Sequence, residues 1–390
     1  MKSKVLVVTQ SYPGPGSPVS GIFVREQAET LKHRYEVAVL VLLPRWVSGR
    51  GLLGFKGLPK VKVADEGGIT VFRQEVLLPA EGRFRILEPP LWVLAGLGVE
   101  KAAKAWKRPD IIHAHVAWPA GWAATGYARM AGLPLVITEH TGPFSSLMKN
   151  PAMSRTVGRV FKKADRVLAV SPDLTDQMRE FFPDLPITVI GNVIRTDIFA
   201  PETGKKSGPK RRFRFLSVAL LDPAKGMDYL LEAARTLLDR GVKGFSVTIA
   251  GDGPALPGLK EKAKNLDILG VVDFPGMILR DELVRELNLA DAFVLPSLGE
   301  TFSVVLGEAG ACGVPVIATR CGGPEFVVTP ETGILVPKAD SKALAEAMKK
   351  MISGKLTFDS AAIRNCIVSR FGPEAFLDNI GRVYSSLSQS

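Results

Sequence analysis

The sequence predicts an α/β protein of two doubly wound domains, each built on a parallel sheet with helices on both faces. Short, nearly continuous apolar runs alternate with segments of helical length throughout the chain. Strands with no polar alternation are buried on both faces, which is typical of parallel sheets. The runs fall into two series, and 390 residues suffice for two domains, each with its own core.

Each apolar run is predicted to form one strand. The first series consists of residues 5–9, 36–43, 69–73, 111–115, 135–138, 166–169 and 187–190. The second series consists of residues 214–218, 246–250, 271–274, 292–295, 314–318 and 333–336. Ligands of open parallel sheets bind outside the carboxyl ends of the strands, so we expect the chemistry in a cleft between the two domains.

A polar segment at 200–212 marks the predicted domain boundary, because hydrophobic residues disappear there and Gly, Pro and Lys accumulate. We therefore expect an N-terminal domain at 1–200 and a C-terminal domain at 201–372. A last helix is expected at 373–390, after Phe371-Gly-Pro373.

Composition argues against several classes of protein. No apolar run reaches the roughly 18 residues that a membrane-spanning helix needs, and the first apolar stretch is too short for a signal peptide. The three cysteines lack the spacing of a disulfide framework or a zinc site. We expect a cytoplasmic protein, with contact to the inner face of the cell membrane where its basic segment allows it.

That basic segment lies at 45–62. The formal net charge is +11, and most of the excess belongs to the first half of the chain. Residues 45–62 contain no acidic side chain and combine Arg and Lys with Trp and Phe, which suits the surface of an anionic membrane. The alternative is a solvated loop. The sequence lacks a basic face interleaved with aromatics, so we expect no nucleic-acid partner.

A glycine-rich loop at 11–21 follows the first predicted strand and ends at Gly21, just before a helical segment. Free backbone N–H groups at such a helix start suit a phosphate group. The spacing is not that of a dinucleotide-binding loop, and the second strand lacks the acidic residue that would hold an adenosine ribose.

The segment 296–315 carries the strongest constellation in the chain. A predicted strand ends near Pro296, and Ser303 is expected to cap a helix that runs to about Cys312. Glu300 then precedes the helix, and Glu308 lies more than one turn inside it. Two carboxylates at this separation can reach different hydroxyl groups of one extended ligand, while the first helical amides face an anion between them. The alternative makes Glu300 a charge at the start of the helix and Glu308 a surface residue.

At these residues the chain resembles family 4 of the retaining glycosyltransferases, which have the two-domain GT-B fold. Glu300 and Glu308 match the family's E-x7-E signature, and the run Ala-Cys-Gly-Val-Pro-Val-Ile-Ala-Thr at 311–319 follows it. Ile-Ala-Gly-Asp-Gly-Pro at 249–254 and Gly-Asn-Val-Ile-Arg-Thr-Asp-Ile-Phe at 191–199 match two further motifs. The resemblance covers nearly the whole chain, and it implies that the last helix crosses back to the first domain.

The resemblance also implies roles for individual residues. Glu300 would contact hydroxyls of the donor sugar, Glu308 the ribose of the nucleotide, and Lys225 the diphosphate. The donor-binding residues expected by this comparison are Gly21, Lys225, Glu300, Phe302, Ser303, Val304, Val305 and Glu308.

The chain departs from the family at one position. Relatives carry an arginine and a lysine in the loop after the first strand of the second domain, and both neutralise the donor diphosphate. This chain retains Lys225 but has Leu220 at the arginine position. Arg25, Arg280 and Arg320 are candidate substitutes that the sequence does not rank.

Histidines mark two predicted strand ends in the first half. His113 and His115 lie at the end of one strand, Trp118 follows that strand, and His140 follows the next. His140 matches the family's T-x-H position beside the sugar and is expected to be catalytic with Lys225 and Glu300. His113, His115 and Trp118 are candidates for contact with the acceptor, although a strand histidine such as His113 is commonly a satisfied core residue. These phrases resemble transferases of the teichuronic-acid type, which build cell-surface polysaccharide.

The resemblance implies a retaining transfer from a nucleoside diphosphate sugar, with UDP or GDP as the expected nucleotide, to a glycan or lipid-linked acceptor. No covalent protein nucleophile is expected. The chain contains no DxD motif, so we expect no metal ion and no other cofactor. The alternatives are a GT-B sugar-nucleotide epimerase and a non-catalytic nucleotide-sugar-binding protein, since a fold does not fix an activity.

Overall fold

The computed structural model describes residues 2–14, 17–47, 61–79, 84–202 and 212–387. The chain divides into two compact units, and each is described by itself. The first unit contains Met1–Val193 together with Phe376–Ser390, and the second contains Ile194–Ala375.

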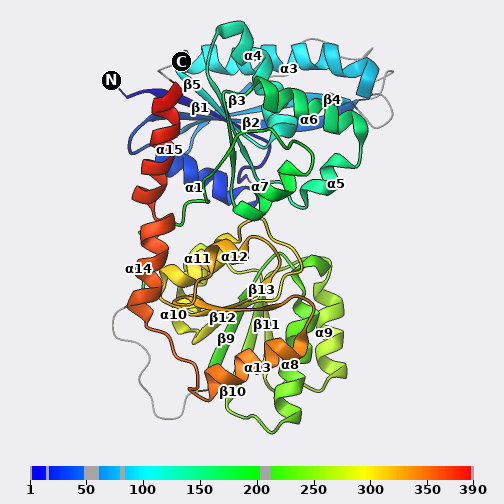
Figure 1. Cartoon of the computed structure of the whole chain (residues 1–390), viewed down its shortest axis with the longest axis vertical. Coiled ribbons are helices and arrows are strands. Elements are labelled where there is room, and N and C mark those ends of the chain that lie inside the picture. The colour runs from blue at the N-terminus through cyan, green and yellow to red at the C-terminus, as the bar shows by residue number, and fades with distance from the viewer. Residues whose placement is uncertain (1, 15–16, 48–60, 80–83, 203–211, 388–390) are drawn as a thin grey trace. The chain divides into compact units, whose positions relative to one another are not determined.

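Eight strands form one sheet in the described part of the first unit, in the order β3-β4-β2-β1-β5-β6-β7-β8 (Figure 1). Neighbouring strands are parallel except for β3 and β4, which are antiparallel. The strand bounds are β1 Lys4–Thr9, β2 Glu36–Val47, β3 Val61–Asp65, β4 Thr70–Pro79, β5 Ile111–His115, β6 Leu135–Glu139, β7 Arg166–Ala169 and β8 Ile187–Val189.

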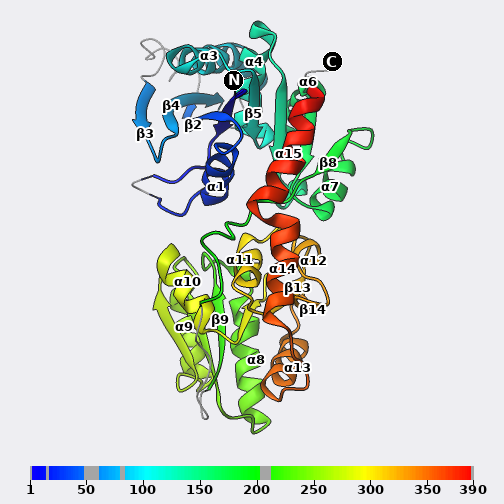
Figure 2. The same cartoon turned by 90° about the vertical axis from the view of Figure 1, so that its left-hand side faces the viewer.

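Helices cover both faces of this sheet. They are α1 Ile22–Leu31, α3 Phe84–Trp106, α4 Trp122–Ala131, α5 Phe144–Met148, α6 Pro151–Lys163, α7 Pro172–Arg179 and the C-terminal α15 Pro373–Leu387, with a short helical turn at Ala117–Gly121. Val5 and Val7 of β1 share a core cluster with side chains of α1 and α15. Leu6 and Val8 are also fully buried, and strand alternation directs them to the opposite face. Figure 2 shows α15, in red, running alongside the first unit.

The second unit has a parallel sheet of six strands in the order β11-β10-β9-β12-β13-β14, among the residues described. Its strands are β9 Phe213–Val218, β10 Phe245–Ala250, β11 Val272–Gly276, β12 Ala292–Leu295, β13 Val316–Arg320 and β14 Gly333–Pro337. Its helices are α8 Met227–Asp239, α9 Leu256–Asn265, α10 Arg280–Leu289, α11 Val304–Ala311, α12 Pro324–Val327, α13 Ser341–Ile352 and α14 Ser360–Phe371, with a 3-10 turn at Pro223–Lys225.

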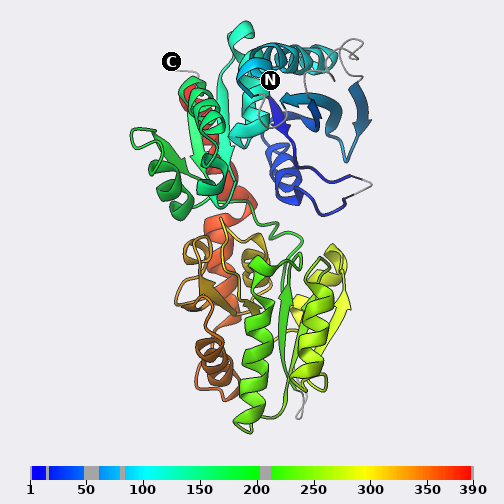
Figure 3. The same cartoon turned by 90° about the vertical axis from the view of Figure 1, so that its right-hand side faces the viewer.

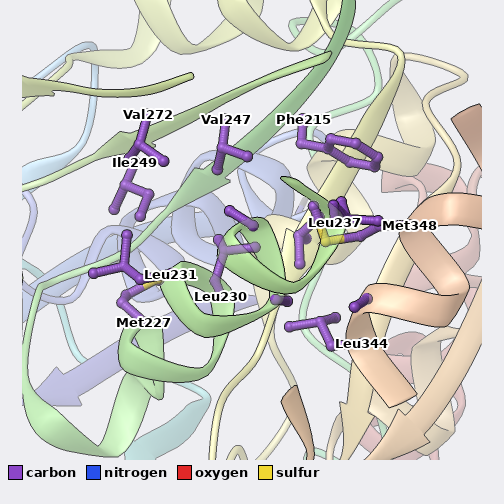
Figure 4. Close-up of a cluster of buried hydrophobic side chains, with 14 of the residues drawn as sticks. Phe215, Met227, Leu230, Leu231, Leu237, Val247, Ile249, Val272, Leu344 and Met348 are labelled. Carbon is purple, nitrogen blue, oxygen red and sulfur yellow. The ribbon is translucent and has the colours of Figure 1, made fainter. Parts of the chain in front are cut away.

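A continuous apolar core lies between this sheet and α8, α9 and α13. Figure 3 shows α8 and α9 lying along β9. In Figure 4, Leu230 and Leu231 of α8 face Val247 and Ile249 of β10, and Leu237 of α8 lies beside Met348 of α13. Each of these side chains is completely shielded from solvent. At about 1.5–3 kcal/mol for each fully buried aliphatic side chain, this layer contributes a large part of the unit's stability.

Every predicted strand is present, with ends that differ by a few residues. The prediction missed β3, an antiparallel edge strand whose side chains are mostly exposed. Most of the basic segment 45–62 lies outside the described residues, and its two ends belong to β2 and β3. No helix in the described part of the chain has both the length and the hydrophobicity to cross a membrane.

The division between the units falls at Val193/Ile194, not at 200/201. The backbone N–H of Ile194 donates to the carbonyl of Phe371 at 2.8 Å, which ties this segment to the second unit. The Arg364 guanidinium on α14 also donates to the carbonyls of Thr196 and Phe199, each at 2.9 Å. Hydrophobicity and Gly/Pro content along the sequence do not reveal these long-range hydrogen bonds.

Candidate functional site

The strand order of each sheet shows where a ligand can bind. In the second unit, β9 and β12 are neighbours, and the chain runs outward from them in opposite directions. Open α/β sheets bind ligands at the carboxyl ends of two such strands, where the connecting loops diverge. Lys225 follows β9 and Glu300 follows β12, so both lie at this switch point.

The loop after β9 is held directly against the loop after β12. Gly226 has φ +62°, and a Cβ atom there would lie 2.1 Å from the carbonyl oxygen of Pro296. The N–H of Leu298 donates to the carbonyl of Ala224 at 2.8 Å. The Asp222 carboxylate caps the 3-10 turn by accepting from Ala224 N–H at 2.7 Å. These contacts set the start of the Lys225 side chain beside residues 296–300.

Lys225 and Glu300 form an ion pair at the switch point. Nζ of Lys225 lies 2.9 Å from Oε1 of Glu300, and the Glu300 side chain is 13% exposed. Oε1 also accepts from the Ser297 hydroxyl at 2.7 Å. Residue 300 is held by its backbone as well, through a β-bridge with Gly322. An ammonium group carries three donors, so Lys225 can bind Glu300 and an anionic ligand together.

Ser303 stands at the first cap position of α11, but it does not cap the helix as the sequence analysis expected. Its φ of 76° is left-handed, and its side chain accepts no hydrogen bond from the helix. A capping hydroxyl needs an extended backbone to reach the amides of the first turn. Among the described residues, Oγ of Ser303 is buried without a partner. The first turn of α11 therefore keeps free amide donors beside an unsatisfied hydroxyl.

Close packing fixes α11 in place. Phe302, just before the helix, is buried and makes edge contacts with Phe326 and Phe371 at 6.2 and 5.2 Å between ring centroids. A Cβ atom on Gly307 would lie 2.5 Å from Ile194, and one on Gly310 would lie 2.7 Å from Ile367. Glycine at these positions lets the helix approach its neighbours closely.

Three further residues that were predicted to bind the donor lie on α11 itself. Val304 and Val305 form the first turn and are half-buried. Glu308 follows one turn later, and 9% of it is exposed. A carboxylate at this depth is a strong hydrogen-bond acceptor for a ligand hydroxyl. The order of groups is Glu300, helix amides, Glu308, as the sequence analysis expected.

The first unit has its own switch point, between β1 and β5. The loop after β1 ends at Gly21, whose φ is +65° and whose Cβ atom would lie 2.2 Å from the carbonyl carbon of Ser11. Glycine is therefore required for the loop to turn back on itself before α1. The loop after β5 contains Trp118, which is buried and lies 4.9 Å from Trp122 between ring centroids. A contact between Trp118 and an acceptor remains a prediction.

His113 is a satisfied core residue, which is the alternative that the sequence analysis weighed against acceptor contact. Its Nδ1 lies 2.7 Å from the Tyr384 hydroxyl of α15, and its Nε2 lies 2.7 Å from the Thr138 hydroxyl. The side chain is completely buried. Burial lowers the pKa of His113 to about 3. With both ring nitrogens occupied by protein, His113 offers nothing to an acceptor.

His115 and His140 form a pair at the carboxyl edge of β5 and β6. Nδ1 of His115 and Nε2 of His140 are 2.9 Å apart, and the rings are stacked with centroids 5.2 Å apart. His140 also lies against Phe23, at 4.7 Å between centroids. Burial, and then the neighbouring imidazoles, hold the pKa of His115 well below its usual value. Burial lowers the pKa of His140 to about 3.

Sequence reasoning missed Glu139. Its carboxylate is completely buried and accepts three backbone hydrogen bonds, from Ala117 at 2.9 Å, His140 at 3.0 Å and Thr141 at 2.9 Å. It thereby joins the loop after β5 to the loop after β6 and sets the backbone of His140. The sequence did contain an indication of this role, because Glu139 is an acidic residue directly after a strand predicted to be buried, and a buried carboxylate needs hydrogen-bond donors.

Two family models match the chain. "Glycosyltransferase Family 4" matches residues 20–198, and "Glycosyl transferases group 1" matches residues 212–354. The D-inositol 3-phosphate glycosyltransferase of Mycobacteroides abscessus is 31% identical over 340 residues, which cover 79% of this chain and 73% of that protein. The chain belongs to the group 1 glycosyltransferases.

Two other relatives of this group 1 glycosyltransferase match over different shares of their length. Glycogen synthase of Mycobacterium tuberculosis is 32% identical over 273 residues, and the chain spans 64% of its length. TuaC of Bacillus subtilis, which is named for teichuronic acid biosynthesis, is 29% identical, and the match covers 89% of this chain and 88% of TuaC.

Solved structures show that this group 1 glycosyltransferase has the GT-B fold. Sucrose-phosphate synthase of Thermosynechococcus elongatus superposes with a TM-score of 0.73 at 22% identity, with both chains fully covered. Anabaena HepE, in complex with UDP and glucose, superposes with a TM-score of 0.73 at 18% identity, covering 99% of this chain and all of HepE.

This group 1 glycosyltransferase carries an exposed leucine in the loop after β9. Leu220 is 56% exposed. The loop around it touches the turn after β10, because Cβ atoms on Gly251 and Gly253 would lie 1.9 and 2.4 Å from the carbonyl oxygens of Ala219 and Leu221. The glycines of the 249–254 motif are therefore required by this contact.

The three arginines considered as substitutes for a cation at position 220 lie in different places. Arg320 ends β13, two residues before Gly322, which forms a β-bridge with Glu300. Arg280 begins α10. Arg25 lies in the first unit and pairs with Glu29 at 2.8 Å. No group of His, Cys, Asp and Glu side chains in the described ranges could hold a metal ion.

Proposed function

We propose that the chain transfers a sugar from a nucleoside diphosphate sugar to an acceptor hydroxyl, with retention of the anomeric configuration. The observation that carries this proposal is the Lys225–Glu300 ion pair at the switch point of the second sheet, beside the start of α11. The unsatisfied Ser303 hydroxyl and the deeper Glu308 extend the same line of polar groups.

Each group suits one part of such a donor. The Lys225 ammonium and the amides of the first turn of α11 stabilise the negative charge that grows on the diphosphate as it leaves. Glu300 accepts hydrogen bonds from sugar hydroxyls, and Glu308 from ribose hydroxyls. Ser303 supplies one further donor to a phosphate oxygen. HepE, a fold neighbour, has been solved with UDP and with UDP-glucose, and UDP or GDP is the nucleotide that we propose here.

The proposed transfer uses no covalent protein intermediate. The bond between the sugar C1 and the phosphate oxygen breaks, the acceptor oxygen bonds C1 on the same face, and the acceptor proton moves to the departing phosphate. Lys225 lowers the barrier by stabilising that phosphate in a partly buried setting, where charge interactions are stronger than in water. We propose that this reaction requires no metal ion.

We further propose that the acceptor is a glycan or a lipid-linked glycan of cell-surface polysaccharide biosynthesis. The similarity to TuaC over most of both chains supports this assignment. The basic segment 45–62 would then hold the protein to the cytoplasmic face of an anionic membrane.

A screen of donors tests the proposed function. Melting temperature is measured with UDP-, GDP- and ADP-linked sugars, and the donor that stabilises the chain is used in a transfer assay with EDTA present. We expect one nucleotide to raise the melting temperature and the product to keep the donor's anomeric configuration by proton NMR. An inverted product contradicts retention, loss of transfer with EDTA contradicts metal independence, and an altered sugar nucleotide released without acceptor indicates an epimerase.

A further inference from the structure

The hydrogen bond between His115 and His140 determines what His140 can do chemically. Two imidazoles joined through Nδ1 and Nε2 at 2.9 Å share one proton when both are neutral. The rings of His113, His115 and His140 are stacked in series, with centroids 4.8 and 5.2 Å apart, and burial disfavours a positive charge on each of them. The pKa values of all three lie far below the usual histidine value, so both members of the pair are neutral near pH 7.

Two arrangements of that proton are possible. In one arrangement, His115 is protonated on Nδ1 and donates to Nε2 of His140, and Nε2 of His115 is unprotonated. Because Nε2 of His140 then accepts, the proton of His140 is on its Nδ1. In the other arrangement, His140 is protonated on Nε2 and donates to Nδ1 of His115. The proton of His115 is then on its Nε2, and Nδ1 of His140 is unprotonated. Within the described part of the chain, Nε2 of His115 is buried without a hydrogen-bond partner.

This buried nitrogen decides between the two. Among buried backbone groups, an N–H without an acceptor is rarer than a carbonyl that lacks a donor, and we expect the same order for imidazole nitrogens. In the first arrangement, Nε2 of His115 is an acceptor without a donor. In the second, Nε2 carries a proton and is a donor without an acceptor. His113 does not alter this choice, because its two partners are hydroxyl groups that can donate or accept.

We propose that His115 is a positioning residue that donates its Nδ1–H to His140 and thereby holds His140 with its own proton on Nδ1. This inference rests on the proposed function and on the expectation, implied by the family resemblance, that His140 lies beside the sugar. His140 is then a hydrogen-bond donor to a substrate oxygen, such as a sugar hydroxyl or a phosphate oxygen, and not a general base. Among the described residues, no acceptor is bonded to Nδ1 of His140, so this N–H is available to a ligand.

Nitrogen NMR of the full chain tests the tautomer without any variant. The sequence has four histidines, and a His33→Gln spectrum identifies the exposed one. At pH 7 we expect the chemical shifts of Nδ1 in His115 and His140 to be those of protonated nitrogens. We expect the shifts of both Nε2 atoms to be those of unprotonated nitrogens. An unprotonated Nδ1 on His140, or an imidazolium at His115 or His140 at that pH, overturns the proposal.

Kinetics provide a matched pair of variants. His115→Asn can present an amide N–H at the place of Nδ1, whereas His115→Leu has similar bulk and no donor. We expect His115→Asn to stay within about 3-fold of the parent, and His115→Leu to lose about 10-fold or more in kcat with little change in KM. Equal losses in the two variants contradict the positioning role. If no donor supports transfer, the proposed function fails, while the NMR result still decides the tautomer.

Discussion

At the scale of single residues, Lys225 carries the proposed chemistry most directly. Its Nζ lies 2.9 Å from Glu300, and the sequence analysis identified both residues from the family motif. The same motif could not reveal Ser297, which shares Oε1 of Glu300. Serine is common in loops, and its role depends on how the backbone turns after β12.

Substitution of Lys225 by Met should reduce kcat by about 100- to 1000-fold, because the leaving diphosphate loses a preorganised cation. Glu300 keeps its hydrogen bond from Ser297, so the site stays in place. Lys243→Met, at an exposed position of the same unit, serves as the control. Circular dichroism confirms folding of both variants, and near-parental turnover of Lys225→Met would contradict its role.

Glycine at position 226 is required by space as well as by backbone conformation. Gly226→Ala adds a Cβ atom 2.1 Å from a backbone carbonyl oxygen, whereas Gly241 has a similar φ of +72° and nothing within 4 Å. We expect Gly241→Ala to cost about 1–2 kcal/mol from the left-handed backbone alone, and Gly226→Ala to cost clearly more. Urea unfolding measures both. Equal losses would show that the contact with Pro296 does not constrain the loop.

At the scale of elements, helix α11 shows where sequence patterns succeed and where they fail. The helix begins and ends close to the residues that the sequence predicted. As predicted, Glu300 precedes it and Glu308 lies within it. The prediction that Ser303 caps the helix was wrong, because cap preference is statistical and the backbone of Ser303 is left-handed here, with φ 76°. A Cβ atom on Gly323 would lie 2.3 Å from the backbone nitrogen of Phe302, which shows how tightly this turn is enclosed.

The histidine cluster on β5 and β6 could not be predicted from sequence either. It depends on the register that places His115 beside Thr138, and on the Tyr384 hydroxyl supplied by a helix far along the chain. The sequence indicated histidines at two strand ends. It did not indicate which ring nitrogens are bonded to protein.

This cluster should make the first unit sensitive to acid. His113 and His140 have folded pKa values of about 3, below the unfolded value of about 6.5, so between these pH values the unfolded chain binds more protons. The free energy of unfolding therefore falls as pH decreases through this window, by up to about 1.4 kcal/mol per pH unit for each histidine.

His113→Gln should reduce that slope, and His33→Gln, which removes an exposed histidine, should not. All five tryptophans belong to the first half of the chain, so their fluorescence during urea unfolding reports on the first unit. The slope of the unfolding free energy between pH 6 and 4 is compared among the three proteins. An unchanged slope in His113→Gln would contradict the buried, neutral state of this histidine.

At the scale of the whole molecule, two sheets and their helices were predictable because buried parallel strands are nearly continuous apolar runs. The exposed edge strand β3 lacks that signal, since its alternating polar and apolar residues resemble a basic loop. The domain boundary near residue 194 could not be predicted from the sequence pattern either, because long-range hydrogen bonds from Arg364 of α14 join the segment after it to the second unit.

The C-terminal helix belongs to the core of the first unit, although it follows the second in sequence. Phe376, Leu377, Ile380, Val383 and Tyr384 of α15 are all buried within it. At about 1.5–3 kcal/mol for each buried apolar side chain, their removal costs an amount comparable with the whole stability of a typical domain. A chain that ends at Gly372 should therefore lose the cooperative fluorescence transition of the first unit. Ser385→Ala, at an exposed position of α15, should retain it, and a truncated chain with the parental transition would contradict this assignment.

A crystal structure of the full chain with an intact nucleoside diphosphate sugar tests the central claim most directly. We expect the diphosphate to lie between Nζ of Lys225 and the first amides of α11, with the sugar at Glu300 and the ribose at Glu308. A donor bound elsewhere, with Lys225 still paired only to Glu300 and the Ser303 hydroxyl still unsatisfied, would contradict it.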